Sequence, residues 1–149
     1  MVQIIHQEIE KEICNYLSPF KDYYAEHCFD FEIKSDWWND NAYRVEVFGY
    51  HKDDYKPNEQ TRFILLRLFI HHEYKQVQIS NIFLPNFMRC SGIGKRLISK
   101  IFLVSGKAQY ELFIVDMVPS FYKRMIARGA LPCDECDDAV QIVSETKLF

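Results

Sequence analysis

Residues 84–98, Leu-Pro-Asn-Phe-Met-Arg-Cys-Ser-Gly-Ile-Gly-Lys-Arg-Leu-Ile, form the segment that most narrows what this chain can fold into. An apolar run with a period of two precedes it and an apolar run with a helical period follows it, so it is predicted to join a strand to a helix. Gly92 and Gly94 stand at this junction. Glycine lets the backbone approach a ligand closely, and the first amides of a helix have no partners within the helix. The segment therefore predicts a turn whose backbone N–H groups bind an oxyanion.

The spacing of its residues separates this turn from two familiar phosphate-binding loops. A P-loop has glycine five residues before its Gly-Lys pair and Ser or Thr after it, but this chain has Arg89 and Arg96 there. A dinucleotide-binding fingerprint needs a third glycine where Leu97 stands. The pattern that remains is Arg-x-x-Gly-x-Gly, which begins at Arg89 and ends at Gly94.

This pattern resembles the acetyl-coenzyme A signature of the GNAT superfamily of N-acetyltransferases, in which the loop amides hold the coenzyme A pyrophosphate. The resemblance covers most of the chain after about residue 40 and is most specific over residues 79–106. It implies a single GNAT-like domain over residues 1–149, of mixed α/β (α+β) class, with a central, mostly antiparallel sheet flanked by helices. It also implies direct transfer of an acetyl group from acetyl-CoA, as co-substrate and without a metal, to a primary amine of a small molecule or peptide.

The resemblance assigns coenzyme-binding residues by position. In the family, the strand before the signature parts from the next strand, and its free backbone groups bind the pantetheine arm and polarise the acetyl carbonyl. The residues at the matching positions are Ile82, Phe83 and Leu84. The residues expected at the pyrophosphate are Arg89, Cys90, Ser91, Gly92, Ile93, Gly94 and Lys95.

The general acid that the resemblance implies is Tyr122. Many relatives have a tyrosine in the last helix, four residues before a Gly-Phe pair. Counted back from Gly129, that position is Met125 in this chain, and Tyr122 lies one helical turn earlier on nearly the same face. Two interpretations stay open, that Tyr122 reaches the thioester sulfur or that it packs in the core or caps a surface.

No general base is assigned from the sequence. Some relatives use a glutamate in the signature strand, but the matching residue here is Gln78, which cannot accept a proton. His71, His72 and Glu73 near the start of that strand are candidates that act directly or through water, although histidines in a polar turn are usually just solvated. Asp116 is a further polar candidate.

Composition narrows the partners and the compartment. A net charge of −3 argues against general nucleic-acid binding, and the apolar run of residues 63–70 is too short to span a membrane. Because the chain begins without a signal-like segment and has an odd number of cysteines, five, we expect a reducing cytoplasm. Whether a homodimer forms is left open.

Two motifs have alternative interpretations. Cys133 and Cys136 suggest zinc or redox chemistry, but structural zinc needs four ligands and no second pair follows, so a reduced loop is favoured. Trp37 and Trp38 lie where this fold often shapes the acceptor pocket, and ordinary core packing explains them equally well.

Hydrophobic periodicity and breaker residues predict the order of elements. The predicted helices cover residues 3–17, 20–28, 92–105 and a segment from 119 that stops at Gly129, with Gly106 just past the end of the third helix. The predicted strands cover residues 29–34, 43–50, 60–71, 76–84, 110–118 and 139–143, with a loop at 35–41 and a turn at 52–59. The strand at 60–71 is apolar in both alternating sets, so we expect helices or loops on both of its faces.

A second function remains open beside the acetyltransferase. Gln78 and the displaced Tyr122 favour a catalytically silent acyl-CoA-binding or protein-interaction module on the same fold. The sequence does not identify the acceptor, because a fold does not dictate a substrate.

Overall fold

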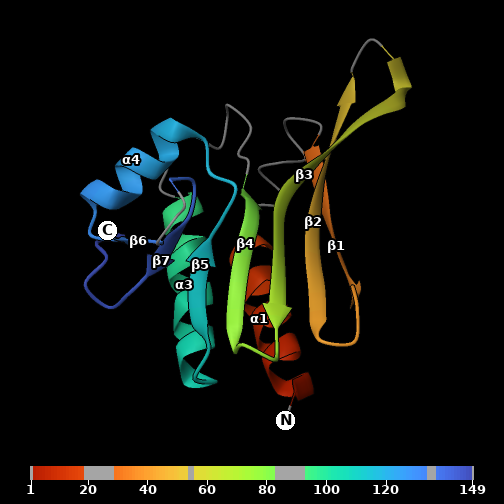
Figure 1. Cartoon of the computed structure of the whole chain (residues 1–149). Coiled ribbons are helices and arrows are strands. Elements are labelled where there is room, and N and C mark those ends of the chain that lie inside the picture. Colours follow the sequence, from red (N-terminus) through yellow and green to blue (C-terminus); the bar gives the residue numbers. More distant parts are fainter. Residues whose placement is uncertain (1, 19–28, 54–55, 83–92, 134–136, 149) are drawn as a thin grey trace.

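The computed structural model describes residues 2–18, 29–53, 56–82, 93–133 and 137–148. Its centre is a seven-stranded sheet in the order β1-β2-β3-β4-β5-β7-β6, in which β4 and β5 are parallel and every other neighbouring pair is antiparallel (Figure 1). The strands are β1 Phe29–Trp37, β2 Ala42–Asp53, β3 Lys56–His71, β4 Gln76–Ile82, β5 Glu111–Ile114, β6 Leu131–Pro132 and β7 Val140–Ile142. The described helices are α1 Val2–Leu17, α3 Ile93–Lys107 and α4 Pro119–Ala127. The expected class, mixed α/β with a mostly antiparallel sheet, is confirmed.

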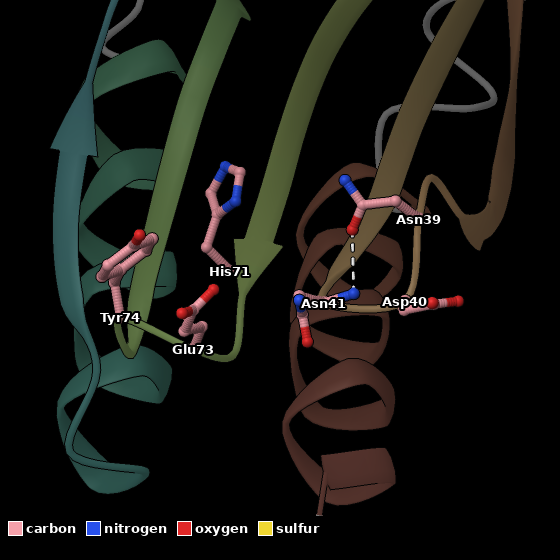
Figure 2. Close-up of a pocket in the computed structure, with 6 residues that line it drawn as sticks. All are labelled: Asn39, Asp40, Asn41, His71, Glu73 and Tyr74. Carbon is pink, nitrogen blue, oxygen red and sulfur yellow. Dashed lines mark hydrogen bonds between the residues drawn. The ribbon is translucent and has the colours of Figure 1, made fainter.

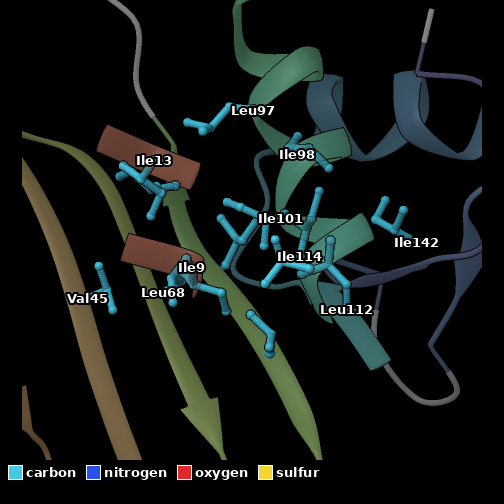
Figure 3. Packing of buried hydrophobic residues seen from close by; sticks show 14 of the residues in the cluster. Ile9, Ile13, Val45, Leu68, Leu97, Ile98, Ile101, Leu112, Ile114 and Ile142 are labelled. Carbon is cyan, nitrogen blue, oxygen red and sulfur yellow. The ribbon is translucent and has the colours of Figure 1, made fainter. Parts of the chain in front are cut away.

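Helices α1 and α3 lie together behind one face of the sheet (Figure 1). The four-residue spacing of Ile5, Ile9 and Ile13 puts these side chains on one side of α1, where all three are buried. Figure 3 shows Ile9 and Ile13 together with aliphatic side chains of α3 and of the sheet. The core therefore lies between the two helices and one sheet face.

The opposite face of the sheet is more polar. On β3, Leu66, Leu68 and Ile70 are fully buried in the core, whereas Arg67 and Phe69 alternate with them and stay partly exposed. The expectation that β3 is covered on both faces is therefore wrong for this part of the strand. The prediction failed because Phe69 is apolar, although its side chain lies on the polar face of the sheet.

Several predicted boundaries differ from the structure. Strand β1 continues through Trp37 into the predicted loop, and β2 and β3 extend into the predicted turn at 52–59, where Asp53 pairs with Lys56. Strand β5 ends at Ile114, four residues early, and β6 has no sequence signal. Long hairpins satisfy backbone groups by pairing even where the side chains are polar, so composition alone misplaced these ends.

The two predicted helix stops have different outcomes. Gly129 follows α4 with φ +95°, as a left-handed cap requires. Gly106 lies inside α3 instead of after it, and the left-handed residue at that end is Gln109, with φ 63°. The predicted helix at residues 20–28 lies outside the described residues.

Alanine substitutions at these two glycines should have opposite effects. Gly129→Ala forces a side chain into left-handed backbone and puts its Cβ 3.2 Å from the Glu145 carbonyl oxygen, so we expect a loss of about 1–3 kcal/mol in the free energy of unfolding. Gly106→Ala meets no atom within 4 Å and should be neutral or stabilising by up to about 1 kcal/mol. Urea unfolding measures both variants. Equal stability of the Gly129 variant and the wild type would contradict the proposed cap.

Candidate functional site

Strands β4 and β5 part at their carboxyl ends. Their parallel pairing ends at Ile79 opposite Ile114, and the Val115 N–H makes the last bond to the Ile79 carbonyl, at 2.9 Å. Beyond it, Asp116 takes a left-handed conformation with φ 54°, and the chain turns toward β7. Strand β4 runs on to Ile82 while paired with β3 on its other side. Among the described residues, no strand pairs with this edge of β4 beyond Ile79, and it is called the released edge below.

A β-bulge lies at this point of β4. Ile79 pairs with Leu68 and Asn81 pairs with Arg67, so Ser80 is an extra residue in β4. A bulge bends its strand and redirects the side chains that follow it. The Ser80 hydroxyl oxygen is buried and has no hydrogen-bond partner among the described residues. A buried hydroxyl without a partner costs about 1–3 kcal/mol, and a bound polar group would remove that cost.

The amino end of α3 lies at the same end of the sheet as the parting of β4 and β5 (Figure 1). Ile93 begins this helix, and Gly94 and Lys95 lie half-buried in its first turn. That turn contains no acidic residue, so its positive dipole end is not compensated within the helix. Ile82 is partly buried and packs against the core. The other residues predicted to bind the coenzyme lie outside the described residues: Phe83, Leu84, Arg89, Cys90, Ser91 and Gly92.

Helix α4 carries the predicted general acid. Tyr122 lies in its first half, partly exposed, with part of its ring against the core. Met125, at the family position counted back from Gly129, is 1% exposed and has no proton to donate. Both interpretations of Tyr122 stay open, because its ring contacts the core without being enclosed.

The base candidates lie at the wrong end of β4. His71, His72 and Glu73 precede the first residue of this strand, and its rise of roughly 3.3 Å per residue puts them about 20 Å from Ile82. These three candidates, which the sequence left unassigned as a base, therefore lie far from the carboxyl end of β4. The Gln78 amide donates to the Gln76 side-chain oxygen at 3.2 Å and leaves that strand without a base at the family position.

A polar pocket of about 320 Å³ lies at that far end, between the β1–β2 and β3–β4 turns (Figure 2). The Asn39 side-chain oxygen accepts from the backbone N–H groups of Asn41 and Ala42, both at 2.8 Å, and fixes one wall. The residues that line the pocket are Asn39, Asp40, Asn41, His71, Glu73 and Tyr74.

At the same end of β4, on the core side of the sheet, two histidines and a tyrosine form a hydrogen-bonded cluster. The Nε2 atoms of His6 and His72 are 2.7 Å apart, and His72 Nδ1 is 2.7 Å from the Tyr110 hydroxyl. His6 also stacks on Tyr43, with ring centroids 3.7 Å apart. At 2.7 Å, one imidazole must donate and the other accept, so the pair is stable when both rings are neutral.

Burial determines the protonation state of the histidines and tyrosines in this cluster. It lowers the pKa of His6 from 6.5 to about 4, with a further contribution from His72, and it also lowers the pKa of His72. Burial raises the pKa of Tyr43 and of Tyr110. His6 was not predicted as a functional residue, although its spacing to Ile9 and Ile13 places it on the apolar side of α1.

The chain was compared with family models, with curated proteins and with solved structures, and none of them matched. None of the described helices combines the length and the apolarity needed to traverse a bilayer. Within the described ranges, no group of three or more His, Cys, Asp or Glu side chains is placed to hold a metal ion. Cys136 lies outside those ranges.

Acid should destabilise the protein through His6. Because the folded pKa of about 4 lies below the unfolded value of 6.5, the unfolded chain takes up a proton first as the pH falls. We expect the free energy of unfolding to lose roughly 2 kcal/mol between pH 6.5 and 4 from this residue, with no contribution above that range.

The measurement is urea unfolding at several pH values. His6→Phe keeps an aromatic ring on Tyr43 and removes the imidazole of residue 6, so it should reduce the slope of the profile and leave the part that comes from His72. His71→Gln, on the other sheet face, is the control and should change the slope less than His6→Phe, because His71 acts only through its charge effect on the pKa of His72. An unchanged slope in the His6 variant would show that the acid sensitivity has another source.

Proposed function

We propose that the protein is an acetyl-CoA-dependent N-acetyltransferase of the GNAT type. The observation that carries this proposal is the parting of β4 and β5 beside the amino end of α3. A released strand edge and an uncompensated helix terminus are the two backbone features that a pantetheine arm and a pyrophosphate require. The bound coenzyme would supply the activated acetyl thioester.

The residues of β4 and α3 would hold the coenzyme. Residues 80–82 of β4 lie beyond the last pairing with β5, and the buried Ser80 hydroxyl lacks a partner among the described residues. The first turn of α3, with Gly94 and Lys95, supplies backbone N–H groups and one cationic side chain. The Arg-x-x-Gly-x-Gly pattern ends in this turn, which supports the same assignment from the sequence.

Tyr122 is the proposed proton donor to the leaving thiolate. It lies on α4, which follows β5 directly at the carboxyl end of that strand (Figure 1). Its partial exposure leaves the ring accessible from outside the core. The amine would lose its proton to solvent or to a group still to be identified, since the residue at the family position is Gln78.

One observation favours a silent acyl-CoA-binding module as the second candidate. Gln78 is a neutral amide already bonded to Gln76, and so it cannot act as a base. A silent module of this kind would bind the coenzyme and would not acetylate any amine.

Coenzyme binding can be tested with two matched glycine variants. Gly94→Glu adds a bulky anion to the proposed pyrophosphate turn and should weaken acetyl-CoA binding by more than about tenfold. Gly106→Glu makes the same change near the other end of α3, where a Cβ meets no atom within 4 Å, and should bind like the wild type. Titration calorimetry measures all three proteins. If acetyl-CoA binding weakens equally in both variants, or if the wild type does not bind acetyl-CoA, the proposal is contradicted.

Turnover tests Tyr122 separately. With acetyl-CoA binding unchanged, Tyr122→Phe should lower kcat by about 10²-fold or more, because the thiolate loses its acid. Tyr74→Phe, at a tyrosine that is 70% exposed, is the control. Release of free thiol from acetyl-CoA with a panel of amines gives the rate. Wild-type turnover in the Tyr122 variant would exclude it as the acid, and no turnover by the wild type despite binding would favour the silent module.

A further inference from the structure

A buried carboxylate on the polar face of the sheet lies between two arginines. Glu46 of β2 has a side chain that is 8% exposed, although no described helix covers this face. Its Oε2 accepts a hydrogen bond from Arg67 Nε at 3.0 Å and lies 2.9 Å from Arg67 Nη2, and its Oε1 forms an ion pair with Arg44 Nε at 2.9 Å. Each arginine keeps about a third of its side chain exposed, 33% for Arg44 and 36% for Arg67.

The arginines have donors left over. Within the part of the chain that the structure describes, Arg67 Nη1 and both Nη atoms of Arg44 have no hydrogen-bond partner. Two guanidinium groups and one carboxylate give this triad a net charge of +1. On the neighbouring strand β1, Lys34 lies opposite Glu46 and Asp36 lies opposite Arg44, and these two charges cancel. The triad therefore matches a ligand group with a single negative charge.

Aromatic rings hold the arginine in place. Trp38 lies over the Arg44 guanidinium, 4.9 Å from its central carbon, and packs edge-on to Phe69 with centroids 5.9 Å apart. Stacking occupies the face of a guanidinium and leaves its N–H edge available. Trp38 is itself 59% exposed, so its ring offers an apolar surface beside those donors. His71 stacks on Phe69 at 6.0 Å and joins this surface to the polar pocket of Figure 2.

The triad is close to the point where β4 and β5 part. Arg67 pairs with Asn81 of β4, directly beside the bulged Ser80. Adjacent strands lie roughly 5 Å apart, so one strand spacing separates Arg67 from β4, whose edge away from β3 is the one that β5 leaves. A small molecule held by the arginines can therefore reach that edge.

We propose that Arg44 and Arg67 bind the carboxylate of a small amine that carries a single carboxylate, such as an α-amino acid with an aromatic side chain. A dianionic phosphate would overcompensate the charge of the triad, whereas one carboxylate neutralises it. Trp38 and Phe69 provide the contact for an aromatic side chain. That this amine is the acetyl acceptor rests on the proposed function; the binding itself does not.

The test compares two ligands that differ by one carboxylate. L-Phenylalanine and phenethylamine are titrated separately into the protein, and NMR follows the indole N–H of Trp38. We expect the wild type to bind L-phenylalanine at least about tenfold more tightly than phenethylamine, as for a hydrogen bond to a charged group. Arg67→Gln or Arg44→Gln should abolish this preference and leave phenethylamine binding unchanged.

A third variant should bind L-phenylalanine more tightly than the wild type, whereas the arginine variants bind it more weakly. Glu46→Gln removes the internal counter-charge and should strengthen L-phenylalanine binding by roughly threefold or more. Lys34→Gln, on the same face of β1, is the control for a general charge effect and should bind like the wild type. If Arg67→Gln fails to fold, the Arg44 and Glu46 variants still give responses of opposite sign.

The outcomes separate this proposal from the acetyltransferase. Equal affinity of the wild type for the two ligands, or an equal loss in the Lys34 and Arg44 variants, would overturn the carboxylate site. A carboxylate preference that follows the arginines supports the site even if acetyl-CoA does not bind, and in that case the acetyltransferase proposal alone fails.

Discussion

The aliphatic layer between one face of the sheet and helices α1 and α3 is the interaction on which the rest of the structure depends. Ile9 and Ile13 of α1 and Ile101 of α3 are fully buried in it. Removing such side chains from water is the main favourable term in folding. Because both helices lie on one face, the other face of strands β2 to β4 stays free to carry polar and aromatic groups, and the two sides of the sheet differ in chemistry.

The crossover from β4 through α3 to β5 places the candidate site. Two parallel neighbours joined by a helix have their carboxyl ends on the same side as the amino end of that helix. Here β5 also ends early, and the bulge at Ser80 falls where β4 loses this neighbour. The end of strand pairing, the amino end of α3 and a hydroxyl without a hydrogen-bond partner among the described residues therefore occur together at one end of the sheet.

The two polar clusters differ in how burial is compensated. His6 and His72 are neutral groups that satisfy each other by sharing hydrogen bonds, so their burial favours the uncharged state. Glu46 is buried as an ion, and two guanidinium groups offset its desolvation. The first arrangement suits a closed packing region, whereas the second leaves donors at the surface of the sheet.

The sequence by itself determined the elements whose signals are local. The spacing of Ile5, Ile9 and Ile13 predicts α1, while Pro119 and Gly129 bracket α4, because helix periodicity, proline and left-handed glycine act within a few residues. The order of elements and the strand before the glycine-rich turn followed from the same kind of signal. The positions of strand ends did not, because pairing with a neighbour decides them.

Tertiary structure alone decided the groupings that carry chemistry. His6 meets His72 across 66 residues, and Arg67 meets Glu46 across 21. Both contacts depend on strand register and on how α1 packs, which residue spacing along one segment does not encode. The bulge at Ser80 is likewise a property of the pairing between two strands. The sequence specified which segments form helices and strands, while the register of the sheet decided which side chains meet.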